Sequence, residues 1–301
     1  MTFALAEAVK NINIATGNNF STGKKTSIPA LKIQFQNDVI TVFESALYRT
    51  TSSVIAWGNA VAIIDPNWLP AEIITIRDFV RKKYPRQKQF LLFTHSDYDH
   101  ILGYGAFPEA EVIAGTDFVN NPSRDTIIQQ ILDFDDNYYV QRNYPIVYPT
   151  ADIIIEVYGQ NESQDGEKTV FFPSPGHVNN GLITVFPDKK MCFAGDYLSN
   201  IEIPMVEHSF VLYEKTLQTF QHVLETYEIQ MLVTGHGDAA HGTSEIRKRL
   251  NEDLQYIQSF LHHFNPSDPA FEACILSKGN LRQNRIIHEN NQLFYQKTRR
   301  P

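Results

Sequence analysis

The most informative segment of this chain reads Phe93-Thr94-His95-Ser96-Asp97-Tyr98-Asp99-His100. It completes an apolar run, Phe90 to Phe93, that predicts a buried strand, and it precedes a glycine-containing segment, Leu102 to Gly105. Loops at the ends of strands often carry the reactive groups of α/β proteins. Two imidazoles and two carboxylates fall here within six residues, and a loop lets all four converge on one or two divalent metal ions.

Three further segments repeat this arrangement of an apolar strand, a glycine and a metal-binding side chain. They read Ser174-Pro175-Gly176-His177, Ala194-Gly195-Asp196 and Thr234-Gly235-His236-Gly237. Glycine directly before the histidine or aspartate permits close backbone approach at a crowded site. Four strand ends of the same kind predict one shared metal site, with these candidate ligands: His95, Asp97, Asp99, His100, His177, Asp196 and His236.

The apolar pattern divides the chain into two halves, each with strands followed by an amphipathic helix. In the first half, Gly58-Asn59 predicts a hairpin turn, 71–84 predicts a helix, and 90–93 predicts a buried strand. The second half predicts strands at 169–172, 182–186, 191–194 and 231–234, a helix through 217–227, and a last amphipathic helix through 246–261.

Composition shifts mark the segments outside these halves. Residues 1–29 are polar and rich in turn residues, which predicts a loosely attached arm. The main domain spans 30–264 and carries an insertion at about 118–150, whose aromatic stretch should cover the site. We interpret 265–301 as a polar C-terminal tail, and either the insertion or the C-terminal helix is a candidate homodimer surface.

Charge and composition exclude several classes of protein. The 301 residues include 26 basic and 34 acidic side chains, a net charge of −8, and the basic residues form no stripe for nucleic acid. The apolar runs are far shorter than the roughly 20 residues that span a membrane. The apolar stretch at the start of the chain, Phe3 to Val9, does not predict a signal sequence, because it is too short and is interrupted by Glu7. The two cysteines, Cys192 and Cys274, lie in apolar runs, where a free cysteine is usually a small core residue. Two cysteines are too few for a disulfide framework, so we expect a reducing, cytoplasmic location.

The four segments, in order and spacing over roughly 31–261, resemble the metallo-β-lactamase superfamily of binuclear metallohydrolases. Its hallmark is His-x-His-x-Asp-His followed by single His, Asp and His ligands. The resemblance implies a four-layer αββα sandwich with the site at the edge of the two sheets. It also implies one metal held by His95, Asp97 and His177, another held by Asp99, His100 and His236, and Asp196 bridging them. Asp65 resembles the family's strand-terminal aspartate, which orients the metal loop.

This chain departs from the family at Asp97, where the second histidine of the motif is expected. A carboxylate is a harder ligand than imidazole and shifts the metal preference toward iron or manganese, although zinc also binds aspartate well. We expect two divalent ions, zinc first, with iron or manganese as alternatives. Asp97 could instead hydrogen-bond a histidine ring without binding metal. The flavo-diiron branch also places a carboxylate there, which leaves a diiron oxygen-binding or redox protein as the alternative function. No flavodoxin-like pattern follows Gly242, however.

The resemblance implies a hydrolase that attacks its substrate with a hydroxide held between two metals. Asp99 and Asp196 are the candidate catalytic residues, because they could orient the hydroxide and pass its proton to the leaving group. The fold serves many substrates. The acidic charge argues against nucleic acids, and the missing signal sequence argues against a secreted β-lactamase. We therefore expect an ester, lactone or thioester of a small neutral molecule.

Four side chains near the motif or in the insertion are candidate substrate contacts: Tyr98, Tyr138, Arg142 and Tyr197. Core packing is the alternative for the insertion residues among them. His208 and His241 are weaker candidates for the cleft. His222 should be solvated, and His262 and His263 should end a helix.

Overall fold

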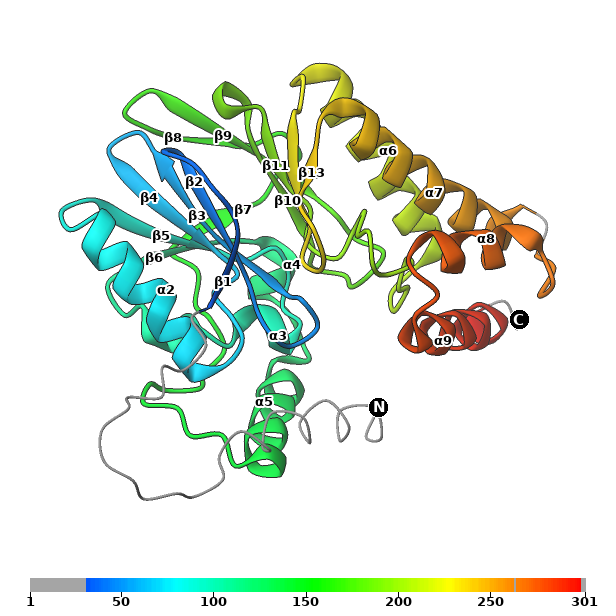
Figure 1. Cartoon of the computed structure of the whole chain (residues 1–301), viewed down its shortest axis with the longest axis horizontal. Coiled ribbons are helices and arrows are strands. Elements are labelled where there is room, and N and C mark those ends of the chain that lie inside the picture. The colour runs from blue at the N-terminus through cyan, green and yellow to red at the C-terminus, as the bar shows by residue number, and fades with distance from the viewer. Residues whose placement is uncertain (1–30, 263, 299–301) are drawn as a thin grey trace, which may run out of the picture.

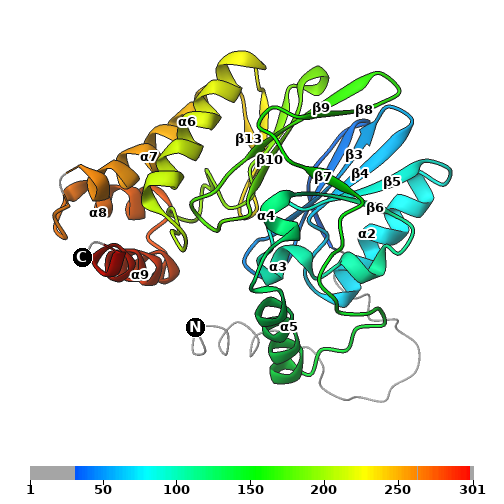
Figure 2. The same cartoon turned by 180° about the vertical axis from the view of Figure 1, so that it is seen from behind.

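The computed structural model describes residues 31–262 and 264–298 (Figure 1). The expected N-terminal arm, 1–29, and His263 lie outside the described residues. Two β-sheets lie face to face in the middle of the molecule, and helices cover their outer faces (Figures 1 and 2). The predicted αββα architecture is confirmed.

The first sheet has seven strands in sequence order. They are β1 (Lys32–Gln36), β2 (Ile40–Glu44), β3 (Thr51–Trp57), β4 (Ala60–Ile64), β5 (Lys88–Leu92), β6 (Glu111–Gly115) and β7 (Ile153–Ile155). Strands β1 to β4 pair antiparallel, and β4 to β7 pair parallel. The predicted hairpin joins β3 to β4, and Gly58 takes the positive φ of +57° that this tight turn requires.

The second sheet has six strands in reversed order, which brings its last strands to one edge. They are β13 (Ala240–His241), β12 (Met231–Val233), β11 (Met191–Phe193), β10 (Leu182–Phe186), β9 (Glu167–Pro173) and β8 (Asn161–Gln164). Strands β11 and β12 are parallel, whereas the other pairs are antiparallel. All four strands predicted for this half are confirmed.

The central strands are apolar on both faces because both faces are covered. In β3, Val54 packs toward the helices of the first half, whereas its neighbour Ile55 packs between the two sheets. The layer between the sheets also contains Trp57, Phe171 and Phe193, all nearly fully buried. Trp57 Nε1 donates to the carbonyl of Glu167 at 2.8 Å, so the sheets are joined at the end of β3 away from Thr51.

Helices α2, α3, α4 and α5 cover the first sheet and its loops. Their bounds are α2 (Pro70–Lys83), α3 (Tyr98–Ile101), α4 (Thr116–Val119) and α5 (Arg124–Tyr138), with short 3₁₀ turns η1 (Tyr104–Ala106) here and η2 (Pro187–Lys189) in the second half. The predicted helix 71–84 is α2, and its apolar positions Ile73, Ile76 and Val80 are all buried. Helix α5 forms the first part of the predicted insertion.

The second sheet is covered by α6 (Phe210–Thr226) and α7 (Thr243–Leu261), and two more helices follow, α8 (Pro269–Ser277) and α9 (Arg282–Thr298). The segment expected as a polar tail is therefore helical from 269 to 277 and from 282 to 298, and α7 is not the last helix. Helix α9 buries Asn284, Ile287, Asn291 and Tyr295 on one face. Since two of these four are amides, the apolar stripe that reveals a helix in a sequence is interrupted.

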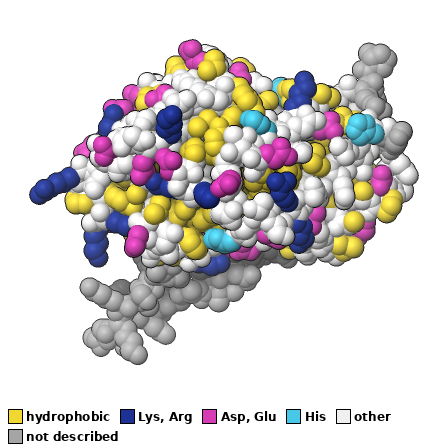
Figure 3. Space-filling view, turned by 90° about the horizontal axis from the view of Figure 1, so that it is seen from above, with side chains coloured by type: hydrophobic (Ala, Val, Ile, Leu, Met, Phe, Trp, Pro, Cys, Tyr) yellow, Lys and Arg dark blue, Asp and Glu magenta, His cyan; other side chains and the backbone are white. Residues whose placement is uncertain are grey.

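None of the described helices has the length and hydropathy needed to cross a membrane. The face shown in Figure 3 mixes Lys and Arg side chains with Asp and Glu side chains among hydrophobic ones. Charges of both signs lie close together on that face, so their fields partly cancel there.

Candidate metal centre

The loop after β5 and the short helix α3 position the first four candidate ligands. His95 and Asp97 lie in the loop, and Asp97 is the residue before α3. Asp99 and His100 lie in the helical turn itself. The segment expected to be a loop is therefore a loop at His95 and Asp97 and a helical turn at Asp99 and His100. The backbone changes direction between these two pairs, so each pair faces different neighbours.

The other three candidate ligands follow strands of the second sheet. His177 comes after β9, Asp196 after β11, and His236 after β12. An isolated backbone bridge joins His236 to Thr50, the residue before β3. In addition, the amide of Thr51 donates to the carbonyl of Gly235 at 2.7 Å. The strand ends of both halves therefore meet at one edge of the sandwich, as predicted.

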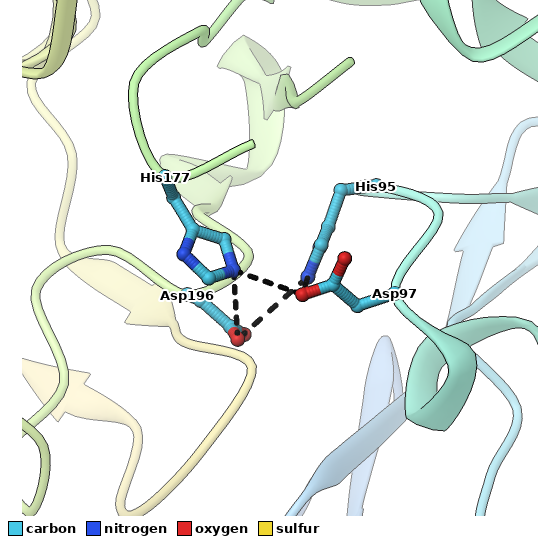
Figure 4. Close-up of side chains that lie close together, drawn as sticks. All are labelled: His95, Asp97, His177 and Asp196. Carbon is cyan, nitrogen blue, oxygen red and sulfur yellow. Dashed lines mark hydrogen bonds and ion pairs between the residues drawn. The ribbon is translucent and has the colours of Figure 1, made fainter. Parts of the chain in front are cut away.

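His95, Asp97, His177 and Asp196 form the first cluster, in which four potential ligand atoms lie within 4.8 Å of one another (Figure 4). His177 Nε2 lies 3.2 Å from Asp97 Oδ2. Asp196 Oδ2 lies 3.6 Å from His95 Nε2 and 3.5 Å from His177 Nε2. Two imidazoles and two carboxylates from three separate segments thus point at one small volume.

Asp99, His100 and His236 form the second cluster, again with their potential ligand atoms within 4.8 Å of one another. Asp196 borders this cluster as well. Its Oδ1 lies 3.2 Å from His100 Nε2, and its Oδ2 lies 3.4 Å from His236 Nε2. The two clusters therefore share Asp196, which is the bridging position that the resemblance implies.

Three atoms at the meeting point of the clusters are buried without a hydrogen-bond partner. They are His95 Nε2, His100 Nε2 and Asp196 Oδ1. A buried polar atom left unpaired costs about 1–3 kcal/mol, so such atoms are rare in folded proteins unless something binds them. Imidazole nitrogens and carboxylate oxygens are the ligands of zinc, iron and manganese. The residues present therefore fit two divalent cations.

The far side of each histidine ring is tied to the protein, so that Nε2 faces the cluster. His95 Nδ1 lies 3.0 Å from Thr94 Oγ1, and His177 Nδ1 lies 2.9 Å from the carbonyl of Met205. His236 Nδ1 lies 3.0 Å from the carbonyl of Tyr48. Such contacts fix the orientation of a metal-binding imidazole.

Asp65 fixes the fourth ring. Its Oδ2 lies 3.0 Å from His100 Nδ1, and its two oxygens also accept hydrogen bonds from the amide and hydroxyl of Thr94. Because Thr94 in turn contacts His95, one aspartate at the end of β4 orients two histidines of the motif. The contacts of Asp65 are those expected of the family's orienting aspartate.

Glycine is required beside Asp196. A Cβ atom at Gly235 would lie 2.1 Å from Asp196 Oδ1 and 2.9 Å from His100 Cε1. A Cβ at Gly176 would lie 2.4 Å from the Cα of Tyr213, and the φ of Gly176 is +138°. The glycines singled out in the sequence therefore allow the close packing that brings the ligands together.

The charged groups of the two clusters shift one another's pKa values. Burial opposes a charge on His177, but the hydrogen bond and the charge of Asp97 outweigh burial and raise the pKa of His177 to about 10. Likewise, Glu202 and Asp196 overcome burial and raise the pKa of His236 to about 10. Burial would raise the pKa of Asp196, but His236 and His100 hold it well below 3.8. The carboxylates therefore favour positive charge at the imidazoles, and a divalent cation held there would take the place of their protons.

A cavity of about 630 Å³ opens above the two clusters. Asp97, Asp99, Asp196 and His236 form part of its floor, and Tyr98, one of the candidate substrate contacts, also lines it. Tyr48 also lines the cavity, although sequence reasoning missed it. Burial and the nearby charge of Asp99 raise the pKa of Tyr48 to about 12, so its hydroxyl stays protonated at neutral pH and can donate a hydrogen bond.

Two amide side chains support the loop that carries His95 and Asp97, and the sequence pattern did not predict them either. Asn180 Oδ1 accepts from the amide of Ser96 at 2.9 Å, and Asn121 Nδ2 donates to Ser96 Oγ at 2.8 Å. Both amides line the cavity, as do Glu202 and Gln283. The only signal in the sequence is that Asn180 closely follows His177, because a lone amide forms no pattern.

The three other predicted substrate contacts do not line the cavity. Arg142 donates to the carboxylate of Asp135 at 2.7 and 2.8 Å and to the carbonyl of Trp68 at 2.9 Å. The ring of Tyr138 packs on a phenylalanine of α5. The hydroxyl of Tyr197 donates to the carbonyl of Ser174 and accepts from the amide of His177. These contacts hold the insertion and the His177 loop in place.

Of the other histidines considered in the sequence, one lies at the cavity and three lie on the surface. His208 lines the cavity. His241 is exposed and packs against the ring of Phe35. His222 and His262 are exposed on the surface.

Comparison with known proteins agrees with this geometry. The metallo-beta-lactamase superfamily matches residues 47–236. No curated protein matches the chain. Among solved structures, a metallo-beta-lactamase from Pontibacter korlensis is similar with a TM-score of 0.54 and 14% identity, over 75% of this chain and 99% of that one. The BLEG-1 B3 metallo-beta-lactamase gives 0.53 and 16%, over 71% and 97%.

A sec-alkylsulfatase, Pisa1 from Pseudomonas sp., is similar with a TM-score of 0.57 and 13% identity, over 74% of this chain and 42% of that one. At such low identity, these three likenesses show the fold alone. The family match is more direct, because it covers more than half of the chain and contains all seven candidate ligands, from His95 to His236. This chain therefore belongs to the metallo-beta-lactamase superfamily.

Proposed function

We propose that this protein is a hydrolase that depends on two divalent cations, zinc first, and cleaves an ester, lactone or thioester of a small neutral molecule. The observation that carries the proposal is the pair of ligand clusters that share Asp196 on the floor of a cavity. His95, Asp97 and His177 would hold one cation, whereas Asp99, His100 and His236 would hold the other.

Cations bound there supply a Lewis acid for a carbonyl oxygen and lower the pKa of water. The chain's own residues do the rest. Asp196 lies between the clusters and fixes the spacing of their ligands. Asp99 lines the cavity, so its carboxylate can accept a proton from the attacking water and return it to the leaving group. Tyr48 and Tyr98 are placed to donate hydrogen bonds to substrate oxygens.

The cavity lining supports a neutral substrate. Among the described residues that line it there is no lysine or arginine, whereas amide and hydroxyl side chains are frequent: Ser96, Asn120, Asn121, Asn179, Asn180 and Gln283. Glu202 and Glu207 also line the cavity, and burial raises the pKa of both carboxyl groups, which favours their uncharged forms. An anionic group remote from the reacting bond would find no cationic partner here.

A diiron oxygen-binding or redox protein is the second candidate, and Asp97 favours it. Its carboxylate lies in the first cluster, 3.2 Å from His177 Nε2, where the family motif has a histidine. With His95 and His177 it forms a set of two histidines and one carboxylate, which is typical of non-haem iron sites. We also expect a cytoplasmic location, with which the free, buried thiols of Cys192 and Cys274 are compatible. A homodimer stays a prediction.

Metal content separates the two candidates. The protein is produced in medium that supplies zinc, iron and manganese together and is purified without chelators or a nickel column, and its metals are counted by plasma mass spectrometry. About two equivalents of zinc or manganese, with turnover of a panel of neutral esters, lactones and thioesters, support the hydrolase. About two equivalents of iron, with a visible absorption band that responds to oxygen, support the alternative. Less than one equivalent of any metal contradicts both.

A further inference from the structure

Residues 199–207, which we name the wall segment, connect the Asp196 loop to α6. The segment forms one side of the cavity through Glu202, Met205 and Glu207. It has no regular secondary structure, so its backbone groups need partners from elsewhere. Most of these partners are polar side chains at the C-terminal end of the chain.

Two asparagines of α9 bind the backbone of the wall segment. Asn284 accepts from the amide of Ile203 at 3.1 Å and donates to the carbonyl of Ile201 at 2.8 Å. Asn291 accepts from the amide of Val206 at 3.0 Å and donates to the carbonyl of Pro204 at 2.6 Å. Both side chains are almost completely buried, with 0% and 1% exposed. Each primary amide thus pairs with two peptide groups, as a neighbouring strand would.

Lys278, between α8 and α9, makes a third contact. Its ammonium group is buried, donates to the carbonyl of Ser199 at 2.5 Å and pairs with Asp253 at 3.1 Å. The hydroxyl of Ser199 donates to the carbonyl of His236 at 3.0 Å. One end of the wall segment is therefore fixed between the C-terminal region and a candidate ligand.

The other end of the wall segment contacts His177. The carbonyl of Met205 lies 2.9 Å from His177 Nδ1, which fixes the ring with Nε2 toward the first cluster. Met205 is flanked by Pro204 and Val206, the two residues that Asn291 binds. The orientation of His177 therefore depends on Asn291 through a single intervening residue.

Helix α9 also reaches the cavity directly, because Gln283 and Ile287 line it. In Figure 2, α9 lies below α7 and α8, on the side of the second sheet. A region that the sequence presents as a polar tail therefore contributes one wall of the cavity and supports another.

We propose that α9 is a positioning element of the metal centre. Asn284 and Asn291 hold the wall segment, and Asn291 thereby holds the carbonyl of Met205 against His177. Neither asparagine touches the clusters, so both are positioning residues and not catalytic ones. The proposal rests on the proposed metal-binding role of His177.

The test compares Asn291→Ala with Asn290→Ala, which removes the same side chain from the exposed face of the same helix. Partners that orient a metal ligand commonly contribute 10–100-fold to metal affinity. We expect Asn291→Ala to weaken zinc at one of the two sites by about tenfold, measured by competition with a chromophoric chelator. The cobalt-loaded variant should also show altered visible bands. Asn290→Ala should match the unaltered protein in both measurements.

Asn284→Ala distinguishes the two asparagines. Its partners, Ile201 and Ile203, lie farther from Met205, so this variant should loosen the wall segment and leave zinc affinity within about twofold. Asn291→Asp keeps the acceptor for Val206 but loses the donor for Pro204, and it replaces the alanine variant if that one fails to fold. A folded Asn291 variant with unchanged zinc affinity and an unchanged cobalt spectrum overturns the proposal.

Hydrogen exchange tests the same idea in the unaltered protein, with or without metal. The amides of Ile203 and Val206 should exchange as slowly as the amides within α9, because their acceptors belong to that helix. Fast exchange of both amides while α9 stays protected overturns the proposal. If the unaltered protein binds no metal at all, the proposed function fails, and hydrogen exchange still decides whether α9 holds the wall segment.

Discussion

Asp196 lies within 3.6 Å of the Nε2 atoms of four histidines, and no other candidate ligand has as many of them close by. It follows β11 through Gly195, faces Gly235 across a gap too small for any side chain, and leaves Oδ1 without a hydrogen bond. A single carboxylate therefore determines how close the two clusters lie.

Replacing this residue tests whether it is shared. Asn has the same shape but carries one oxygen and no charge, so Asp196→Asn should reduce bound metal from two equivalents to one or fewer. Hydrolysis should fall at least about 100-fold, since even partners outside the ligand set cost 10–100-fold. Asp188→Asn, on an exposed turn, is the control. Two equivalents of metal with full turnover in Asp196→Asn would contradict the role of Asp196.

Gly235 offers a steric test at the same place. In Gly235→Ala the added methyl would overlap Asp196 Oδ1, so the carboxylate must move out of the shared position. We expect loss of at least one metal equivalent and a free energy of unfolding lower by about 1–3 kcal/mol. Gly115→Ala, where the nearest atom would lie 3.9 Å from the new Cβ, should change neither. Full metal content in Gly235→Ala would contradict this prediction, because the backbone would then be able to move and make room for the methyl group.

All seven side chains of the two clusters are candidate ligands in the sequence, because each follows an apolar strand and three of them, His177, Asp196 and His236, come directly after a glycine. Partners such as Tyr48, Asn121 and Asn180 could not be predicted, for a physical reason. Tyr48 orients His236 through a backbone carbonyl, which every residue possesses. Asn121 reaches Ser96 from a segment 25 positions away, and nothing local marks it as a partner.

At the scale of elements, α9 shows why a buried helix can escape sequence reasoning. Its buried face alternates amides with apolar side chains, and the amides satisfy a neighbouring loop rather than the core. Helices α2, α6 and α7 bury apolar stripes and were predicted. The difference lies in what each helix packs against.

His288 makes the stability of this C-terminal region depend on pH. Its ring packs on Phe271 with centroids 4.7 Å apart, and its Nδ1 lies 2.9 Å from the hydroxyl of Tyr256. Burial lowers its pKa below 6.5 despite the opposing charges of Glu272 and Glu289. The unfolded chain therefore binds this proton more readily, so the contribution of His288 to stability is present above pH 6.5 and is lost as the pH falls below it.

The measurement is urea unfolding between pH 8 and pH 5. His288→Gln should show a shallower loss of unfolding free energy across pH 6.5 than the unaltered protein does. His222→Gln, which removes an exposed ring from α6, should keep the original slope. Identical slopes for the His288 variant and the unaltered protein would exclude this residue as the cause.

At the scale of the whole molecule, each cluster takes ligands from both halves of the chain. His95 and Asp97 meet His177 and Asp196, whereas Asp99 and His100 meet His236. Cations bound there would join the two sheets at the edge opposite the contact between Trp57 and Glu167. Metal should therefore stabilise the fold as a whole and not one loop.

Removing metal tests this coupling. A ligand present at 100 times its Kd stabilises the folded state by about 2.7 kcal/mol. A chelator should therefore lower the Tm by roughly 5 °C or more, and added zinc should restore it. Asp196→Asn should respond less to the chelator than the unaltered protein does. If the protein is shown to carry metal and its Tm does not change when the chelator is added, the site does not connect the two halves.

The division of ligands between the halves also bears on synthesis. The ribosome makes the chain from its N-terminus, so His95 to His100 emerge long before Asp196 and His236 complete the two clusters. A nascent first half supplies only two ligands to each cluster, His95 and Asp97 to the first and Asp99 and His100 to the second, so neither cluster is complete. We therefore expect metal to be acquired only after translation has passed His236 and the sheets have closed on each other.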